Sequence, residues 1–132
     1  MAALDTNVLV RFLVEDDVAQ LALAKRLIRR CIREGQTLYV SVSISLELEC
    51  VLRSNFGFAK GEVVLALAHL LSAAELSFES EGALELALLL YKENSADYSD
   101  CVHVALAAQA GEQPMWTFDR AAAKLDGAKL LV

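Results

Sequence analysis

The sequence lacks the patterns that build disulfide frameworks, zinc sites and membrane spans. Its three cysteines, Cys31, Cys50 and Cys101, form an odd set without C-x-x-C spacing, so neither a disulfide framework nor a zinc site is encoded. Free thiols are typical of a reducing cytosol. No apolar run reaches the roughly 18 residues of a membrane span, and no basic segment followed by an apolar one opens the chain. We therefore expect a cytoplasmic protein that makes no membrane contact.

Two common catalytic patterns are also missing. His69 and His103 stand alone, without H-E-x-x-H or another paired spacing, so we interpret each as a helix-surface or core histidine. Ser41, Ser43 and Ser45 have neither a nucleophile elbow nor a histidine partner. The sequence therefore gives no support to zinc-protease chemistry or serine hydrolysis.

Basic residues are outnumbered, since 12 Lys and Arg stand against 18 Asp and Glu for a net charge of -6. This balance argues against a protein that binds nucleic acid through bulk electrostatics, because such proteins carry basic surfaces. It does not argue against a nuclease, because carboxylates clustered around a divalent metal ion would account for part of the charge.

The chain has 132 residues and is 56% hydrophobic, which is enough for one core. We expect a single domain over residues 1–132. The apolar fraction is high for so small a body, so we also expect an exposed apolar patch that a second subunit or a partner covers.

Segments with strand and helix patterns alternate along the chain. The expected strands are a buried one that ends at Asp5, Thr37–Val40, Glu75–Phe78, Met115–Thr117 and Lys129–Val132. The expected helices are a short one that carries Val8, Leu9, Phe12 and Leu13 and ends near Glu15, one opened by Glu15-Asp16-Asp17 and closed by Gly35, Ile44–Phe56, Glu62–Ala73, Glu81–Glu93, Asp97–Ala110 and Asp119–Leu125. This alternation predicts an α/β fold with a mostly parallel central sheet and helices on both faces.

The second expected helix has acids at its start and bases toward its end. The bases are Lys25, Arg26, Arg29, Arg30 and Arg33. We interpret them as a solvent-exposed face whose charges suit the helix dipole. A face that follows the phosphates of a nucleic acid is the alternative.

Four acids are candidates for a common site. Asp5 and Asp119 directly follow expected strands, whereas Glu47 and Asp100 lie on helices that follow strands. In parallel α/β sheets, ligands bind in the crevice beyond the carboxyl ends of the strands, and a doubly wound sheet could gather all four acids there.

Other side chains near these acids have competing interpretations. For Asp97 we favour helix capping over a site role, and for Asp119 both stay open. We place Glu49 on the solvent side of its helix and Trp116 in the core. Tyr98 could belong to the core or stack on an RNA base.

A bare cluster of carboxylates is unfavourable, because like charges a few ångströms apart raise one another's pKa. Such a cluster stays ionised when it binds cations, and oxygen-only ligands select Mg²⁺ or Mn²⁺. A metal ion held in this way lowers the pKa of bound water and neutralises charge on a phosphoryl oxygen. The implied chemistry is phosphodiester hydrolysis.

Four segments resemble the successive motifs of PIN-domain nucleases, and their order and separations are similar to those of the VapC toxins of bacterial toxin-antitoxin modules. The segments are Asp5–Arg11, Ser43–Arg53, Ala96–Asp100 and Thr117–Arg120. The resemblance implies a three-layer α/β/α PIN-like domain and a Mg²⁺- or Mn²⁺-dependent endoribonuclease. Asp5, Glu47, Asp100 and Asp119 match the positions of the family's acidic quartet, and we expect Asp5, Asp100 and Asp119 to bind the metal.

The resemblance also implies supporting residues and partners. Asp97 matches a frequent additional acid, and Thr6, Asn7 and Thr117 match polar residues that support the site. The implied assembly is a homodimer that acts on RNA and is inhibited by a small VapB-type antitoxin. We further predict that Arg11 or Arg53 approaches a substrate phosphate or an antitoxin carboxylate.

Three other functions stay open. One is a stand-alone PIN nuclease in RNA processing. Another is an aspartate-based phosphatase or phospho-receiver domain, although Asn7 cannot serve as the general acid that a phosphatase would want two residues after Asp5. The last is a catalytically idle binding module, in which the acids are only caps and solvent charges.

Overall fold

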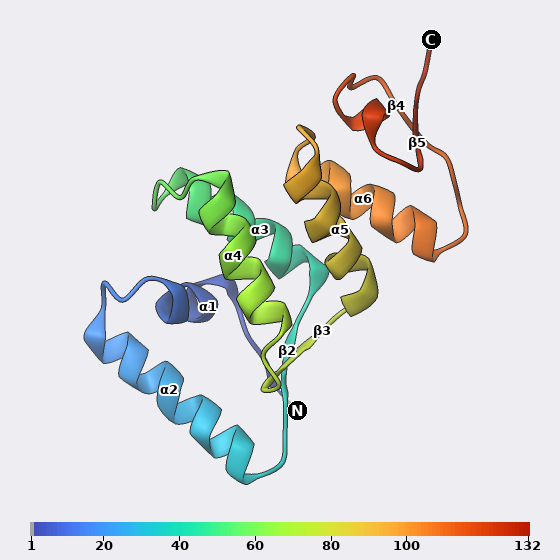
Figure 1. Cartoon of the computed structure of the whole chain (residues 1–132). Helices are drawn as coiled ribbons and strands as arrows, with labels where there is room; N and C mark the ends of the chain where they lie inside the picture. The colour runs from blue at the N-terminus through green and yellow to red at the C-terminus, as the bar shows by residue number, and fades with distance from the viewer. Residues whose placement is uncertain (1) are drawn as a thin grey trace. The chain divides into compact units, whose positions relative to one another are not determined.

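The computed structural model describes residues 2–132 of the chain. These residues divide into two compact units, Met1–Glu79 and Ser80–Val132, and each unit is described by itself (Figure 1). Every strand pair in the described residues is parallel. The predicted fold class, α/β with parallel strands, is therefore confirmed.

The first unit contains a three-stranded sheet in the order β1-β2-β3. Its strands are β1 (Ala2–Ala3), β2 (Leu38–Val40) and β3 (Leu76–Phe78). Its helices are α1 (Thr6–Leu13), α2 (Val18–Arg33), α3 (Val42–Ser54) and α4 (Lys60–Leu71). Parallel neighbours require crossover connections, and helices supply them between successive strands of this sheet.

Side-chain caps begin three of these helices. The Asp5 Oδ1 atom accepts a hydrogen bond from the Val8 N–H at 3.1 Å, and the Asp17 Oδ1 atom accepts one from the Gln20 N–H at 3.0 Å. Ser41 Oγ accepts one from the N–H of Ile44 at 3.2 Å. Each bond satisfies a backbone donor that has no partner inside the helix. The third helix consequently begins at Val42, two residues before the predicted start.

The end of α2 is fixed by Gly35, as the sequence predicts. Gly35 has a positive φ of 65°, a conformation that glycine adopts without a side-chain clash. Its N–H donates to the Ile32 carbonyl at 3.2 Å, and the Gln36 N–H donates to the Cys31 carbonyl at 2.9 Å. This is the Schellman arrangement, which satisfies the last carbonyls of a helix.

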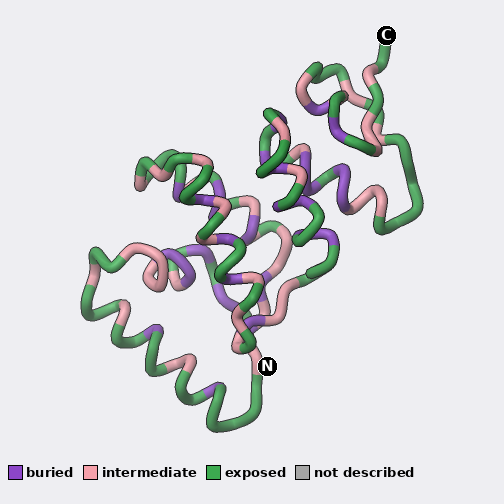
Figure 2. Tube along the Cα trace, in the orientation of Figure 1, coloured by how far each residue is buried: buried purple, intermediate pink, exposed green. Residues whose placement is uncertain are grey.

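The core of the first unit surrounds the central strand β2. Leu38 and Val40 have no exposed surface, and the helices add further fully buried side chains (purple in Figure 2). Those helical side chains are Leu9, Val10, Leu48, Leu52 and Val63. The apolar faces predicted from helical spacing thus place the helices against the sheet.

The second unit is built on α5 (Glu81–Glu93) and α6 (Tyr98–Gln109). The two helices pack through buried side chains that include Leu84, Ala87, Val102 and Ala105. Strand β4 (Met115–Thr117) pairs in parallel with β5 (Ala128–Leu130), and the short 3₁₀ helix η1 (Ala122–Lys124) lies between them in sequence. The bounds of α5 and β4 are those predicted.

Two predicted elements are wrong in extent or burial. The strand before Asp5 has only two residues, Ala2 and Ala3, and both are exposed, because β1 lies at the edge of its sheet and pairs only with β2. The helix predicted over Asp119–Leu125 is only the turn η1, since so short a segment offers few hydrogen bonds to offset the cost of starting a helix.

Two aromatic side chains differ in their surroundings. Tyr98 is buried and packs edge to face on Tyr91, with ring centroids 5.3 Å apart, so it belongs to the core and is not presented for base stacking. Trp116 is 55% exposed, so its predicted core position is wrong. Its strand pairs only with β5 among the described strands, and the Lys129 Nζ lies 5.6 Å from the ring centroid.

All three cysteines are free thiols, as predicted. Within residues 2–132, no helix is both long enough and apolar enough to span a bilayer. The single domain over residues 1–132 stays a prediction.

Candidate functional site

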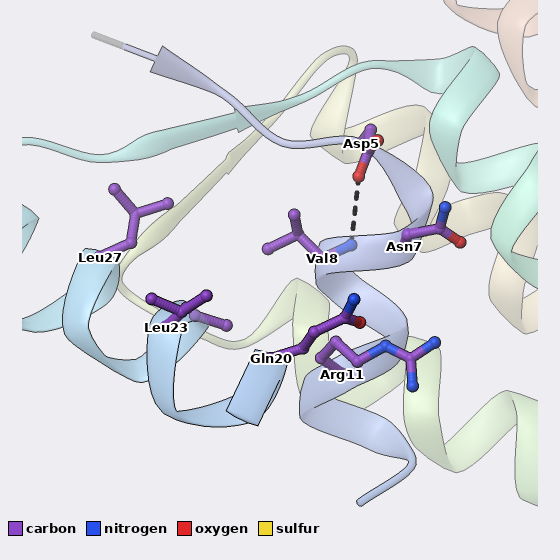
Figure 3. A pocket seen from close by; sticks show the side chains of 8 residues that line it. Asp5, Asn7, Val8, Arg11, Gln20, Leu23 and Leu27 are labelled. Atoms are coloured by element: carbon purple, nitrogen blue, oxygen red, sulfur yellow. Dashed lines mark hydrogen bonds between the residues drawn. The ribbon is translucent and has the colours of Figure 1, made fainter. Parts of the chain in front are cut away.

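Asp5 occupies the junction between β1 and α1, the first position where the sheet meets a helix. Its side chain is exposed apart from the capping bond to Val8. It lines a pocket of about 320 Å³ between α1 and the first half of α2 (Figure 3). The other lining residues are Asn7, Val8, Arg11, Gln20, Leu23, Ala24 and Leu27. The pocket thus combines one carboxylate, one guanidinium and two amides with an apolar wall.

Arg11, whose side chain lines the same pocket, is already paired. It makes a charged hydrogen bond to Asp16, in the segment that leads into α2. Its Nε atom is buried and has no hydrogen-bond partner among residues 2–132. The predicted contact of Arg11 with a phosphate or a partner carboxylate stays a prediction.

Thr6 and Asn7, the two predicted supporting residues beside Asp5, differ in exposure. Asn7 is exposed at the pocket, whereas Thr6 is 2% exposed and its Oγ1 atom finds no partner within the described part of the chain. A buried hydroxyl without a hydrogen bond is uncommon in native structures, and a catalytic role is one of the explanations for such a group.

The two acids of α3 differ in exposure, and one of them is not where the sequence predicted. Glu47 is exposed, whereas Glu49 is 5% exposed, so the placement of Glu49 on the solvent side is wrong. The Arg53 Nε and Nη2 atoms donate to the Glu49 carboxylate, the second at 3.2 Å. This pairing allows an acid to be buried, because the guanidinium provides charge and hydrogen bonds together. It also means that Arg53 has an internal partner.

Three carboxylates interact in the second unit. The pKa of Asp100 is raised above its ordinary value of 3.8, first by burial and then by the negative charges of Asp119 and Asp97. His103, one helical turn further along α6, acts in the opposite direction. Asp119 and Asp97 are therefore each close enough to Asp100 to affect its pKa.

Local hydrogen bonds test the capping interpretation of two of these acids, and a site role stays a prediction for both. Asp97 occupies the cap position of α6 but makes no side-chain capping hydrogen bond, so the favoured capping interpretation is wrong. Asp119 does cap, because its Oδ1 atom accepts from the Ala122 N–H at 2.9 Å. The Asp119 N–H donates to Thr117 Oγ1 at 3.0 Å. This bond links Thr117, a predicted supporting residue, to Asp119, a predicted site acid.

The acids fit a hard metal ion in the chemistry of their donors. All the candidate ligands are carboxylate oxygens, and the pKa of Asp100 is raised first by burial and then by the charges of Asp119 and Asp97, a repulsion that a bound cation relieves. Neither unit, over the described residues, holds three or more His, Cys, Asp or Glu side chains arranged to bind a metal. Asp5 and Glu47 belong to the first unit and the other three to the second, so the gathering of the quartet stays a prediction.

Sequence reasoning missed one polar pair at the carboxyl ends of β2 and β3. Glu79 directly follows β3, and its Oε1 atom accepts from the Val42 N–H at the start of α3 at 2.8 Å. Burial, the charge of Glu79 and its hydrogen bond with the Tyr39 hydroxyl together raise the pKa of Tyr39. The position of an acid just after a strand could have indicated this pair. It ties β3 to the helix that carries Glu47.

His69 and His103 are both exposed on helices, in agreement with one of the two surroundings predicted for them.

No curated protein matches the chain. The family model of the PIN domain matches residues 2–128, which is nearly the whole length. PIN domains have an α/β/α fold and are generally nucleases, hydrolases of nucleic acid that depend on a divalent metal ion. The chain therefore belongs to the PIN-domain family.

Proposed function

We propose that this PIN domain is a Mg²⁺- or Mn²⁺-dependent endoribonuclease that hydrolyses RNA phosphodiester bonds. The observation that carries the proposal is the raised pKa of Asp100 beside Asp119 and Asp97, within a family of nucleases. Carboxylates that repel one another in the metal-free protein are typical of a site that binds a divalent cation.

Each acid has a proposed role. Asp5, Asp100 and Asp119 hold the metal, and Glu47 completes the catalytic quartet. A bound divalent ion supplies charge neutralisation at the phosphoryl oxygens and lowers the pKa of water. The chain itself orients the ligands: the Thr117 hydroxyl fixes the backbone before Asp119, and the α1 backbone fixes Asp5 through the N–H of Val8.

Thr6, Asn7 and Asp97 are proposed to support the site. The buried Thr6 hydroxyl follows Asp5 directly, and Asn7 lies in the same pocket as the Asp5 carboxylate. Asp97 makes no capping bond and contributes to the negative potential at Asp100. Arg11 or Arg53 is proposed to approach the substrate phosphate or an antitoxin carboxylate while its present carboxylate partner stays nearby.

We further propose that the protein is the cytoplasmic toxin of a VapBC pair, a homodimer bound by a VapB-type antitoxin. The support is the order of the four motifs and the presence of large apolar side chains at the surface of the first unit. Those with more than half of their surface exposed are Val18, Leu23, Ile32 and Leu65. A partner that covers them would remove apolar surface from water.

The test is cleavage of RNA with Mn²⁺, with and without a chelator. Asp5→Asn and Asp100→Asn should each lower the metal-dependent rate by roughly 100-fold or more, because each removes a charge aimed at the reacting centre. Asp126→Asn, an exposed acid of the second unit, makes the same chemical change and should cleave like the wild type. Full activity of Asp5→Asn or Asp100→Asn, or cleavage that survives the chelator, would contradict the proposal.

A further inference from the structure

The longest helix of the first unit, α2, carries an unusual distribution of charge. Its 16 residues contain five cations and no acid. The cations, here called the α2 basic tract, are Lys25, Arg26, Arg29, Arg30 and Arg33. Arg26, Arg29, Arg30 and Arg33 follow the spacing i, i+3, i+4, i+7, which places them on one helical face. They span about 10 Å along the axis at the rise of an α-helix.

The tract has no internal counter-charge. All five side chains are exposed, and none forms an ion pair within residues 2–132. Arg11 and Arg53, by contrast, are both paired with carboxylates. Arg26, Arg29 and Arg33 line a hollow of about 400 Å³ together with Ile32, whose side chain is 55% exposed.

The helix dipole explains only part of this arrangement. Arg30 and Arg33 lie in the last turn, where positive charge is favourable. Arg26 and Arg29 lie before it, and each has another arginine four residues further along the helix, a spacing at which like charges repel. An ordinary solvent-exposed face would intersperse acids among these bases. The tract therefore has the composition of a surface for a polyanion.

The tract and one wall of the Asp5 pocket lie on the same helix. Gln20, Leu23, Ala24 and Leu27 of α2 line that pocket, and the basic tract begins at Lys25 on the same helix. Helical spacing places the arginines on a different face of α2 from these pocket residues, so an RNA strand bound by the arginines would have to cross α2 to reach the Asp5 pocket.

We infer that the α2 basic tract binds the sugar-phosphate backbone of single-stranded RNA. This inference rests on the proposed function and assigns it a substrate-holding surface. Planar guanidinium groups bind phosphate oxygens in pairs, and four arginines in a row on one helical face suit a ligand whose negative charges repeat along a chain, as the phosphates of RNA do. A protein of net charge -6 repels RNA over much of its surface, so a local cationic tract is needed to hold the substrate.

Binding of a fluorescently labelled oligouridine 20-mer, measured by anisotropy in EDTA, tests the inference without any cleavage. Arg26→Gln/Arg29→Gln should bind about 10-fold more weakly than the wild type. The slope of log affinity against log salt should become shallower by about 1.4, or about 0.7 for each lost phosphate contact. Arg26→Lys/Arg29→Lys retains the charge and should recover most of the affinity.

The matched control is Lys92→Gln/Lys124→Gln, which removes two exposed cations of the second unit and changes the net charge equally. It should bind within about twofold of the wild type. Circular dichroism melting confirms that each variant is folded. Equal weakening by both double variants, no binding of oligouridine by the wild type, or binding of a polyglutamate peptide in place of RNA would each overturn the inference.

The two proposals fail in different ways. If the wild type cleaves RNA with Mn²⁺ but the arginine variant binds oligouridine normally, the nuclease proposal stands and the α2 assignment falls. If binding depends on Arg26 and Arg29 but no metal-dependent cleavage occurs, the α2 surface stands and the nuclease proposal falls.

Discussion

Glu49 and Arg53 face each other one helical turn apart on α3, with the carboxylate buried and the guanidinium reaching solvent. The pair distinguishes Glu49 from Glu47, the acid two residues before it on the same helix. Glu49 is part of the packing of the first unit, whereas the exposed Glu47 has no such role. Stability and activity should therefore respond differently to changes at the two positions.

Glu49→Gln should lower the free energy of unfolding by about 1 kcal/mol, because it leaves a charged partner with a weaker acceptor at a partly solvated site. Glu47→Gln should change it by less than about 0.5 kcal/mol, as is usual for surface positions. The order of the two variants should reverse in RNA cleavage, where Glu47→Gln should lose more activity than Glu49→Gln. Urea unfolding and a cleavage assay on both variants measure the contrast, and equal stability losses would contradict it.

Thr6→Val should stabilise the protein. The substitution keeps the shape of the side chain and removes a buried hydroxyl that has no partner among the described residues. We expect a gain of about 1 kcal/mol in the free energy of unfolding, together with a lower cleavage rate if the hydroxyl supports Asp5. Thr6→Ser retains the hydroxyl and is the control. A destabilised Thr6→Val protein would show that the hydroxyl has a partner.

Asp17→Ala should destabilise α2. The substitution removes the acceptor for the Gln20 N–H at the start of the helix, a change that costs about 1 kcal/mol. Glu15→Ala, three residues before the helix and exposed, should be within about 0.5 kcal/mol of the wild type. Thermal melting of both variants compares them, and identical melting temperatures would show that the cap contributes nothing.

The raised pKa of Asp100 predicts a pH dependence with a definite sign. In the metal-free protein the folded state holds the Asp100 proton more tightly than the unfolded chain does. The contribution of this group thus favours folding below about pH 4, and it is lost as the pH rises through the raised pKa. Asp100→Asn should therefore raise the stability of the metal-free protein at pH 7.

Asp119→Asn should lower the pKa of Asp100 toward its ordinary value, because the Asp119 carboxylate is the largest of the charges that raise it. Carbon NMR of the carboxyl groups in the metal-free protein measures this directly. Asp126→Asn is the control and should leave the Asp100 titration where it was. An unchanged Asp100 pKa in Asp119→Asn would place the two carboxylates too far apart to share a cation.

The ends of long helices can be predicted from this sequence where helix-breaking residues follow them. Which face of a helix is buried cannot be predicted in the same way. The helix Glu81–Glu93 is bounded as predicted because Asn94 and Ser95 interrupt its apolar spacing. On α3, the apolar residues Ile44, Leu48, Val51 and Leu52 indicated one face, yet the buried residues are Ser45, Leu48, Glu49 and Leu52. The difference arises because Arg53 neutralises Glu49, a tertiary compensation that hydrophobic spacing does not report.

The candidate site divides in the same way. Residue types and their order identified the acids, but spacing alone could not separate a cap from a ligand. Asp119 makes the capping bond that Asp97 lacks, although Asp97 occupies the cap position of a regular helix and Asp119 precedes only a short 3₁₀ turn. The direction in which each side chain points decides between the two outcomes, and the spacing of residues in the sequence does not report it.

The pairing of Arg11 with Asp16 affects which anions can bind in the pocket that Arg11 lines. A phosphate that takes the Nη1 atom of Arg11 displaces a tethered carboxylate, which returns to solvent at little cost because Asp16 is already half exposed. The guanidinium therefore exchanges one counter-ion for another and is never left bare. Such an exchange disfavours weakly charged ligands, which cannot compete with the chain's own aspartate, and selects those with the charge density of a phosphate.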